Sequence, residues 1–252
     1  MRIAYFANNR LGADVADYLR EQGDEVVALV LHPADRRRFG EEILAATGVE
    51  PDRVFDASRL DGGDVRDAIA SAGAEMGLSV LFGYLLRRPL IDLFPRGCVN
   101  LHPAYLPYNR GAYPNVWSIV EGTPAGVTLH VVDEGIDTGE ILCQKTVAVS
   151  PSDTGQSLYR KLEAASLELF REGWPRVRAG QIRPIPQGGE GTAHYVRDVE
   201  KIDAIDLDTR YTARHLIDIL RARTFPPYRG AYFRDGRRKI FVEIRLTVEG
   251  SD

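Results

Sequence analysis

The opening of the chain constrains the fold more than any other stretch of the sequence. Residues 2–7 and 25–31 are short, almost continuously apolar runs, and residues 12–22 between them place apolar side chains at helical spacing. A continuous apolar run is typical of a strand that is buried on both faces of a parallel sheet. A strand–helix–strand opening of this kind predicts a right-handed βαβ unit. We therefore expect an α/β fold built on a mostly parallel sheet.

The turn after the first strand argues against a dinucleotide-binding protein. Residues 7–12 read ANNRLG. The dinucleotide fingerprint is Gly-x-Gly-x-x-Gly, in which the glycines let the backbone approach a pyrophosphate. Because these glycines are missing, we do not expect NAD to bind at this turn in the usual way.

Later segments extend the sheet and then change character. Strands are expected at 78–84 and 98–102, and a long amphipathic helix begins near residue 152. The glycine-rich segment 187–191 is the clearest linker in the chain. We therefore predict a main domain over 1–186 and a small C-terminal α+β segment over 187–252. This segment should hold a helix near 213–221 and a β-hairpin that turns at Asp235-Gly236.

The composition excludes several classes of protein. The 252 residues carry 32 Lys and Arg against 36 Asp and Glu, so the formal charge is −4 and no basic surplus is present for nucleic acid. We see neither a signal peptide nor an apolar run long enough to cross a membrane, and we expect a cytoplasmic protein with no membrane partner. Cys98 and Cys143 lie in apolar runs without metal-ligand spacing, which favours two buried free thiols.

The residues with catalytic potential lie between positions 98 and 139. Asn100 and His102 lie on one face of a short strand that Pro103 ends, and the acidic turn 133–139 supplies Asp137. An Asn amide can stabilise an oxyanion, a His can accept a proton, and an Asp can fix the imidazole tautomer. This set suits attack by an amine or by water on a carbonyl. No Gly-x-Ser-x-Gly motif is present, so a covalent acyl-enzyme is not favoured.

Simpler interpretations apply to several of these groups. Taken alone, the turn 133–139 would be interpreted as a solvated acidic turn, and its spacing fits no standard metal site. A single His beside a strand is usually structural. We apply this interpretation to the four remaining histidines, which are His32, His130, His194 and His215.

Four motifs together resemble the formyltransferase family. They are NLHP at 100–103, LPYNRG at 106–111, GVTLH at 126–130 and DTG at 137–139. The family uses 10-formyltetrahydrofolate and includes methionyl-tRNA formyltransferase, glycinamide ribonucleotide transformylase and the sugar N-formyltransferases. The resemblance covers roughly the first two thirds of the chain. It implies a Rossmann-like formyltransferase domain, a catalytic trio of Asn100, His102 and Asp137, and 10-formyltetrahydrofolate as the formyl donor. Since the spacing of the acidic residues and His fits no standard ligand pattern, we expect no metal.

The resemblance also implies where the folate binds. In the related enzymes, backbone groups of the segment that matches 82–85 receive the pterin, and the acidic turn shapes the same pocket. The expected folate-binding residues are Phe82, Gly83, Tyr84, Leu85, Asp133 and Gly135. A glycine that only ends a strand is the alternative interpretation of Gly83.

The acceptor is predicted from a loop and from the C-terminal tail. Tyr105, Tyr108 and Tyr113 offer faces on which a base or sugar can stack, and Arg110 can meet a phosphate. Packing of a lid is the alternative role for these tyrosines. In the tail, Arg221 and Arg223 either bind a diphosphate or pair with surface carboxylates.

The loop most resembles that of the sugar N-formyltransferases, since tRNA-type enzymes commonly carry a lysine at the position of Tyr108. We therefore expect the acceptor to be the amine of a nucleotide-linked amino-dideoxy sugar, with dTDP as the nucleotide, and the enzyme to be a homodimer. Three alternatives stay open. They are another amine such as methionyl-tRNA, transfer of the formyl group to water, and a folate- or NAD-binding module without formyl transfer.

Overall fold

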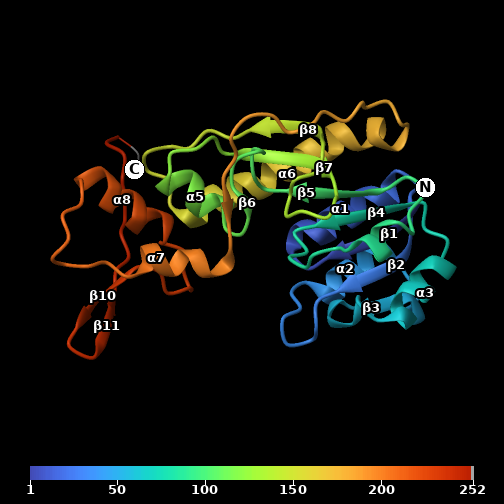
Figure 1. The fold of residues 1–252 in the computed structure, drawn as a ribbon, viewed down its shortest axis with the longest axis horizontal. Helices are drawn as coiled ribbons and strands as arrows, with labels where there is room; N and C mark the ends of the chain where they lie inside the picture. Colours follow the sequence, from blue (N-terminus) through green and yellow to red (C-terminus); the bar gives the residue numbers. More distant parts are fainter. Residues whose placement is uncertain (251–252) are drawn as a thin grey trace. The chain divides into compact units, whose positions relative to one another are not determined.

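The computed structural model describes residues 1–250, and its central feature is a seven-stranded sheet in the order β3-β2-β1-β4-β5-β7-β8. The strands of the βαβ opening, β1 and β2, lie side by side in the sheet (Figure 1). The strands span Arg2–Ala7 (β1), Glu25–Leu31 (β2), Val54–Asp56 (β3), Met76–Val80 (β4), Cys98–His102 (β5), Gly126–Val131 (β7) and Ile141–Thr146 (β8). The predicted α/β fold with a mostly parallel sheet is confirmed.

The sheet is parallel up to β5 and then reverses. β3, β2, β1, β4 and β5 pair in parallel, whereas β7 pairs with β5 in antiparallel register. In β1 only Arg2 is exposed and the next five residues are buried. This burial explains the continuous apolar run, because a parallel strand covered on both faces needs apolar side chains on both.

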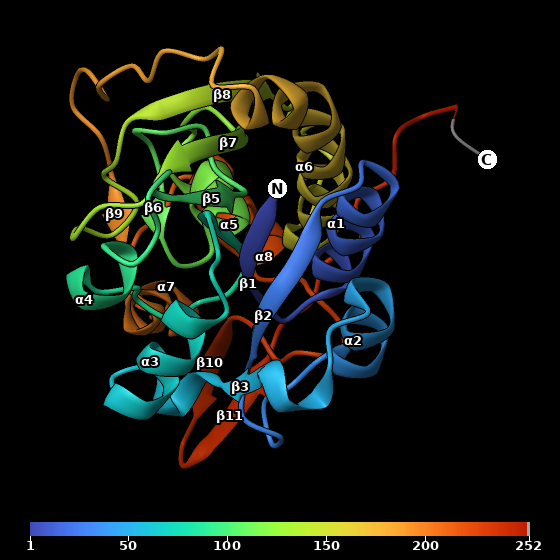
Figure 2. The same ribbon diagram turned by 90° about the vertical axis from the view of Figure 1, so that its right-hand side faces the viewer.

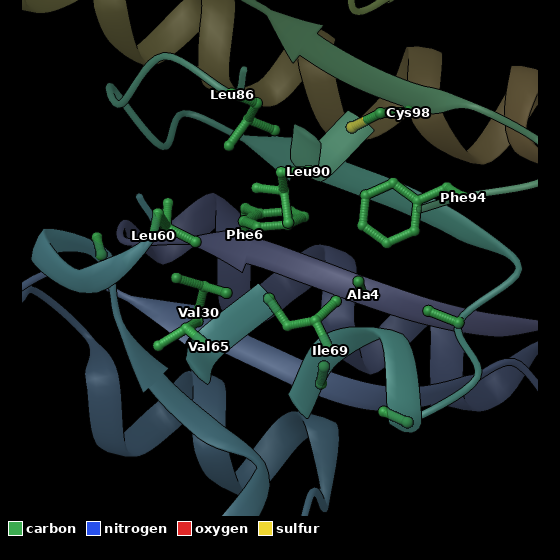
Figure 3. Packing of buried hydrophobic residues seen from close by; sticks show 14 of the residues in the cluster. Ala4, Phe6, Val30, Leu60, Val65, Ile69, Leu86, Leu90, Phe94 and Cys98 are labelled. Carbon is green, nitrogen blue, oxygen red and sulfur yellow. The ribbon is translucent and has the colours of Figure 1, made fainter. Parts of the chain in front are cut away.

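Helices cover both faces of the parallel part of the sheet. Helix α1 (Arg10–Glu21) and α2 (Gly40–Thr47) lie on one face, and α3 (Gly63–Ser71) lies on the other (Figure 2). On the α3 side, Val65 and Ile69 pack against Phe6 and Val30 of the sheet and against Leu90 of the short helix α4 (Arg88–Ile91), as Figure 3 shows. These side chains form an apolar core that packs α3 and α4 against β1 and β2.

The described chain divides into two compact units. The first comprises 1–102, 127–144 and 166–188, and the second comprises 103–126, 145–165 and 189–252. The boundary at residue 187 that the linker predicts stays a prediction.

The second unit has its own small elements. Helix α5 (Pro114–Val120) packs against α8 (Ala213–Ala222), and a two-residue strand β6 (Arg110–Gly111) pairs with β9 (Ala193–His194). The predicted hairpin is present as β10 (Tyr232–Asp235) and β11 (Arg238–Phe241), which pair on either side of Gly236 and Arg237. The remaining short helices are η1 (Pro51–Arg53), η2 (Ala57–Arg59), η3 (Val196–Val199) and α7 (Glu200–Asp203).

The strand predicted over 78–84 ends earlier, at Val80. Leu81 takes a φ of +48° and Gly83 takes a φ of +75°, and a left-handed backbone cannot continue a strand. The chain therefore leaves the sheet at Leu81, and residues 81–85 form a loop at the carboxyl end of β4.

The last turns of helix α6 (Gly155–Arg178) are bonded to a buried carboxylate. The side chain of Asp24 is fully buried, and its carboxylate accepts a hydrogen bond from Trp174 Nε1 at 2.8 Å. The Met1 amino group lies at 2.9 Å and the Arg178 guanidinium at 3.3 Å from the same carboxylate. A buried carboxylate with three donors is satisfied, and it fixes these turns of α6 against the chain between α1 and β2.

No helix among residues 1–250 is both long enough and apolar enough to cross a membrane.

Replacing Asp24 by Ala should lower the free energy of unfolding by about 2–4 kcal/mol, because the buried Met1 amino group and Trp174 Nε1 lose their acceptor, and the partly exposed Arg178 guanidinium loses its ion pair. Urea unfolding followed by circular dichroism measures this loss. Asp17→Ala is the matched control, since the carboxylate of Asp17 is half exposed in an ion pair with Arg20 and should contribute little. Equal stability of the two variants would contradict the anchoring role of Asp24.

Both thiols should react slowly in the folded protein. Burial raises the pKa of Cys143 to about 11, and burial also raises the pKa of the fully buried Cys98. At pH 8 the thiolate fraction of Cys143 should be roughly a hundredfold below that of an ordinary thiol, because each pKa unit is tenfold. Mass spectrometry after iodoacetamide treatment should show labelling only when urea unfolds the chain. Rapid labelling of Cys143 in buffer alone would be the contrary result.

Candidate functional site

The reversal of the sheet at β5 brings polar side chains together. In the antiparallel register Asn100 lies directly opposite His130, and His102 lies opposite Thr128. Residues two apart on a strand point to the same face, so Asn100, His102 and His130 share one face. The ring centroids of His102 and His130 are 6.2 Å apart, and the two rings are perpendicular.

Hydrogen bonds define the protonation of His130 and the orientation of Asn100. His130 Nδ1 lies 2.8 Å from the Val131 carbonyl oxygen, which can only accept, so Nδ1 carries the proton. In a neutral ring Nε2 then accepts, and Asn100 Nδ2 donates to it at 3.1 Å. Asn100 Nδ2 also donates to Asp137 Oδ1 at 3.2 Å. The NH2 of Asn100 is thus directed toward His130 and Asp137.

Asp137 lies close to His102 without bonding to it directly. His102 Nδ1 is 3.6 Å from Asp137 Oδ2, which is an ion-pair distance but too long for a hydrogen bond. The two side chains are 8% and 15% exposed, so water reaches the pair only partly. A small shift of either group, or one bridging water, would complete the contact. The structure therefore brings together the three residues that the sequence predicts, namely Asn100, His102 and Asp137.

The turn 133–139 is held by its own side chains. Asp133 Oδ1 accepts from the backbone N–H of Gly135 at 3.0 Å and from Thr138 Oγ1 at 2.7 Å. A Cβ on Gly135 would overlap Thr138 Oγ1, so a glycine is required there. The predicted folate-binding residues Asp133 and Gly135 thus form a compact loop at the end of β7.

The predicted folate segment 82–85 forms the loop after β4. Phe82 is buried, Leu85 is half exposed, and the backbone at Gly83 has a φ of +75°. The His32 ring contacts the rings of Phe82 and Tyr84, with centroids 5.3 and 5.0 Å away.

His32 also makes a short contact from Nε2 to the Phe82 carbonyl oxygen, which makes Nε2 the donor. Burial lowers the pKa of His32, which favours the neutral ring. His32 therefore supports this loop as a neutral side chain, in line with the structural role that the sequence predicts for it.

The predicted acceptor-binding residues of the loop all belong to the second unit. Tyr113 is 41% exposed and precedes α5, and Arg110 lies in β6. Tyr105 packs where a Cβ on Gly126 would stand, and the backbone N–H of Tyr108 donates to the carbonyl of Tyr105 at 3.1 Å.

Asn109, which lies between Tyr108 and Arg110, fixes this loop. Asn109 is fully buried with a φ of +57°, and its Nδ2 donates to Ser118 Oγ at 2.9 Å and to Thr123 Oγ1 at 2.8 Å. Its Oδ1 accepts from Thr192 Oγ1 at 3.1 Å. Tyr108 and Arg110 therefore flank a rigid point of the backbone.

The two tail arginines make contacts within the second unit. Arg221 is 8% exposed, and its guanidinium donates to Asp218 Oδ1 at 2.6 Å and to the carbonyl of Asp153 at 2.9 Å. Arg223 forms a two-point contact with Asp203 at 2.5 and 3.1 Å. Their roles in diphosphate binding stay predictions, and the structure gives both a structural role in addition.

Comparison with known families identifies the chemistry. Residues 1–172 match the family described as formyl transferase, and residues 198–248 match the N-formyltransferase dimerization C-terminal domain. The chain belongs to the formyl transferase family. The resemblance deduced from the four motifs is thereby confirmed, and the protein is an enzyme of the formyltransferase class.

Two relatives in this formyltransferase family are named for different acceptors. The chain is 34% identical over 187 residues to a dTDP-4-amino-4,6-dideoxyglucose formyltransferase of Mycobacterium bovis, which covers 74% of this chain and 80% of the relative. It is also 34% identical over 240 residues to a methionyl-tRNA formyltransferase of Myxococcus xanthus, which covers 92% of this chain and 74% of the relative.

Solved structures agree with the formyltransferase fold. A 4-N formyltransferase from Francisella tularensis matches with a TM-score of 0.83 and 28% identity, over 98% of both chains. The formyltransferase PseJ from Anoxybacillus kamchatkensis matches with a TM-score of 0.61 and 31% identity, over 80% of this chain and 89% of that one. That structure contains UDP-4,6-dideoxy-4-formamido-L-AltNAc and tetrahydrofolate.

The structure adds one residue to the candidate site of this formyltransferase. The sequence predicts a structural role for His130, as for His32, His194 and His215, whereas in the structure His130 contacts both Asn100 and Asp137. Alternation on β7 is the only signal in the sequence, since it puts His130 and Thr128 on one face. The antiparallel register that sets His130 opposite Asn100 cannot be read from periodicity.

Within residues 1–250, no group of three or more His, Cys, Asp or Glu side chains is arranged to hold a metal ion.

Proposed function

We propose that the enzyme transfers the formyl group of 10-formyltetrahydrofolate to the amine of a nucleotide-linked amino-dideoxy sugar, with dTDP as the nucleotide. The observation that carries the proposal is the cluster of Asn100, His102 and Asp137 at the carboxyl end of β5. An amide donor, an imidazole and a carboxylate meet there at 3.2 and 3.6 Å. The Mycobacterium bovis relative, named for a dTDP-linked 4-amino sugar, supports the acceptor class.

Each member of the trio has one task in this proposal. Asn100 donates a hydrogen bond to the formyl oxygen as negative charge develops there, and His102 accepts the proton that the sugar amine loses as its nitrogen bonds to the formyl carbon. Asp137 stabilises the imidazolium that forms and holds its orientation, directly or through one water. A new carbon–nitrogen bond to the sugar amine replaces the formyl bond to the donor nitrogen, which leaves with a proton.

The folate donor fits the residues of the first unit. When bound, 10-formyltetrahydrofolate supplies an activated formyl group on nitrogen. The backbone at Gly83 is exposed, and a Cβ there would have only His32 within 4 Å, so the loop leaves room for a flat ring against its main chain. Phe82, Tyr84 and Leu85 from this loop, with Asp133 and Gly135, would hold the pterin. PseJ, whose structure contains tetrahydrofolate, supports a folate donor.

The acceptor is assigned to residues of the second unit. Tyr105, Tyr108 and Tyr113 offer aromatic faces for the base or sugar, and Arg110 offers a cation for phosphate. The anchored backbone at Asn109 would hold Tyr108 and Arg110 in place. Arg221 and Arg223 complete the proposal as diphosphate ligands, although both would have to share their present carboxylate partners.

The C-terminal match supports a homodimer. Residues 198–248 match a domain that is named for dimerization, and they include the hairpin of β10 and β11 with Ile240 and Phe241 each 37% exposed.

A methionyl-tRNA acceptor is the second candidate, because the alignment with the Myxococcus xanthus relative covers 92% of the chain. The formal charge of −4 disfavours tRNA, since phosphate contacts need a Lys and Arg surplus.

Mass spectrometry of the reaction products tests the donor and the acceptor together. The enzyme is incubated with 10-formyltetrahydrofolate and a panel of dTDP- and UDP-linked sugars that carry an amine at C3 or C4, with methionyl-tRNA as a further acceptor. We expect one formyl group to be added to a dTDP-linked amino sugar. Formylation of methionyl-tRNA alone would favour the second candidate, and formate release without any amine would show transfer to water.

His102→Asn and Asp137→Ala test the assigned roles. Each should lower kcat by roughly 10²- to 10⁴-fold, because proton transfer in the transition state contributes about that much. His215→Asn is the matched control, since His215 is exposed on α8 and should leave kcat unchanged. The melting temperature and circular dichroism of the three variants show whether the fold is kept. Wild-type turnover in both site variants would refute these roles.

A further inference from the structure

The turn that presents Asp137 is bonded by a side chain from a distant part of the sequence. Gln187 Nε2 lies 2.8 Å from the Asp137 carbonyl oxygen and 2.7 Å from the Gly139 carbonyl oxygen. Both partners are carbonyls, which only accept, so the NH2 group of Gln187 must face them and each amide proton has its own acceptor. Gln187 therefore bridges the two ends of the segment 137–139.

The antiparallel register explains how Gln187 reaches this turn. Ile141 and Ile185 exchange backbone hydrogen bonds of 2.8 and 2.9 Å as an isolated antiparallel bridge beside β8. Two residues beyond such a bridge, Gln187 runs opposite Gly139. Gly139 has no side chain in the way, and a Cβ there would overlap the carbonyl oxygen of Val131.

The backbone at Asp137 needs an external restraint. Its φ of +53° lies in the left-handed region, which costs an Asp about 1 kcal/mol or more, and such conformations persist only where the surroundings impose them. The front of the turn is restrained by Asp133, through Gly135 and Thr138. The carbonyls of Asp137 and Gly139 are restrained by Gln187.

We infer that Gln187 is a positioning residue of this formyltransferase, which holds the backbone of Asp137 so that its carboxylate stays beside His102 and Asn100. This inference rests on the proposed roles of the trio. The carboxylate lies 3.2 Å from Asn100 Nδ2 and 3.6 Å from His102 Nδ1, so a change in the backbone conformation at Asp137 would move it out of reach. Both of these hydrogen bonds from Gln187 go to the backbone of the turn, at Asp137 and at Gly139.

Gln187→Leu keeps the size of the side chain and removes both donors, and Gln187→Glu places a carboxylate against two carbonyl oxygens. We expect kcat to fall by ~10- to 100-fold in Gln187→Leu and further in Gln187→Glu, because small displacements of catalytic groups have effects of this size. KM should change little. Gln181→Leu is the matched control, since Gln181 is an exposed glutamine of the same segment and should behave as the wild type.

A double-mutant cycle separates positioning from general stability. Because Gln187 acts through Asp137, Gln187→Leu should change kcat by less than about twofold when Asp137 is already Ala. If Gln187 had only a structural role, Gln187→Leu would lower kcat by the same factor in both backgrounds. Such additive losses would overturn the inference.

A second measurement needs no substrate, so it holds even if the acceptor or donor is assigned wrongly. The imidazole pKa of His102 is followed by proton NMR in the free enzyme, with His102→Asn used to assign the signal. Titratable groups that face His102 include Asp137 on the turn and His130 on β7. A nearby carboxylate favours the charged imidazolium, so Asp137→Ala should lower the pKa of His102.

Gln187→Leu should also lower the pKa of His102, whereas Gln181→Leu should not. An unchanged pKa of His102 in both Gln187→Leu and Gln187→Glu would overturn the inference, whatever reaction the enzyme performs.

Discussion

The antiparallel pairing of β7 with β5 is the constraint on which the candidate site depends. On its parallel side Asn100 pairs with Ser79 of β4, which offers neither an imidazole nor a carboxylate. Because β7 runs back along β5, His130 is placed opposite Asn100, and the turn that follows β7 returns Asp137 to the same edge. The geometry of the trio is therefore a property of strand register, and side-chain flexibility has little part in it.

Two hydrogen-bond networks hold the side chains of the candidate site in place. Within the site, the proton on His130 Nδ1 leaves Nε2 free to accept from Asn100, so the amide cannot turn over without losing both acceptors. Outside the site, Asp133 and Gln187 hold opposite ends of the turn that carries Asp137. The trio comes from a strand and a tight turn, whereas Asp133 and Gln187, which restrain the turn, take no proton in the proposed reaction.

The fold, and the strand end that presents Asn100 and His102, were predictable from the sequence for physical reasons, whereas the role of Asp137 was expected only from the family resemblance. Continuous apolar runs such as 25–31 identify buried parallel strands, and the spacing of Asn100 and His102 before Pro103 identifies a strand end. The contacts of His130 and Gln187 were not predictable, because each depends on which residues face each other across two antiparallel segments. The end of β4 at Val80 was missed for a similar reason, since nothing in a leucine signals the left-handed conformation of Leu81.

Asn109 has a consequence for how acceptor preference can change over evolution. Its buried side chain holds residues 118, 123 and 192 to one point of the loop, so the course of the main chain there does not depend on its neighbours. Positions 108 and 110 can then exchange one side chain for another while the loop keeps its path. If Tyr108 and Arg110 bind the acceptor as proposed, single substitutions beside Asn109 would change acceptor preference and leave Asn100 and His102 on β5 in place.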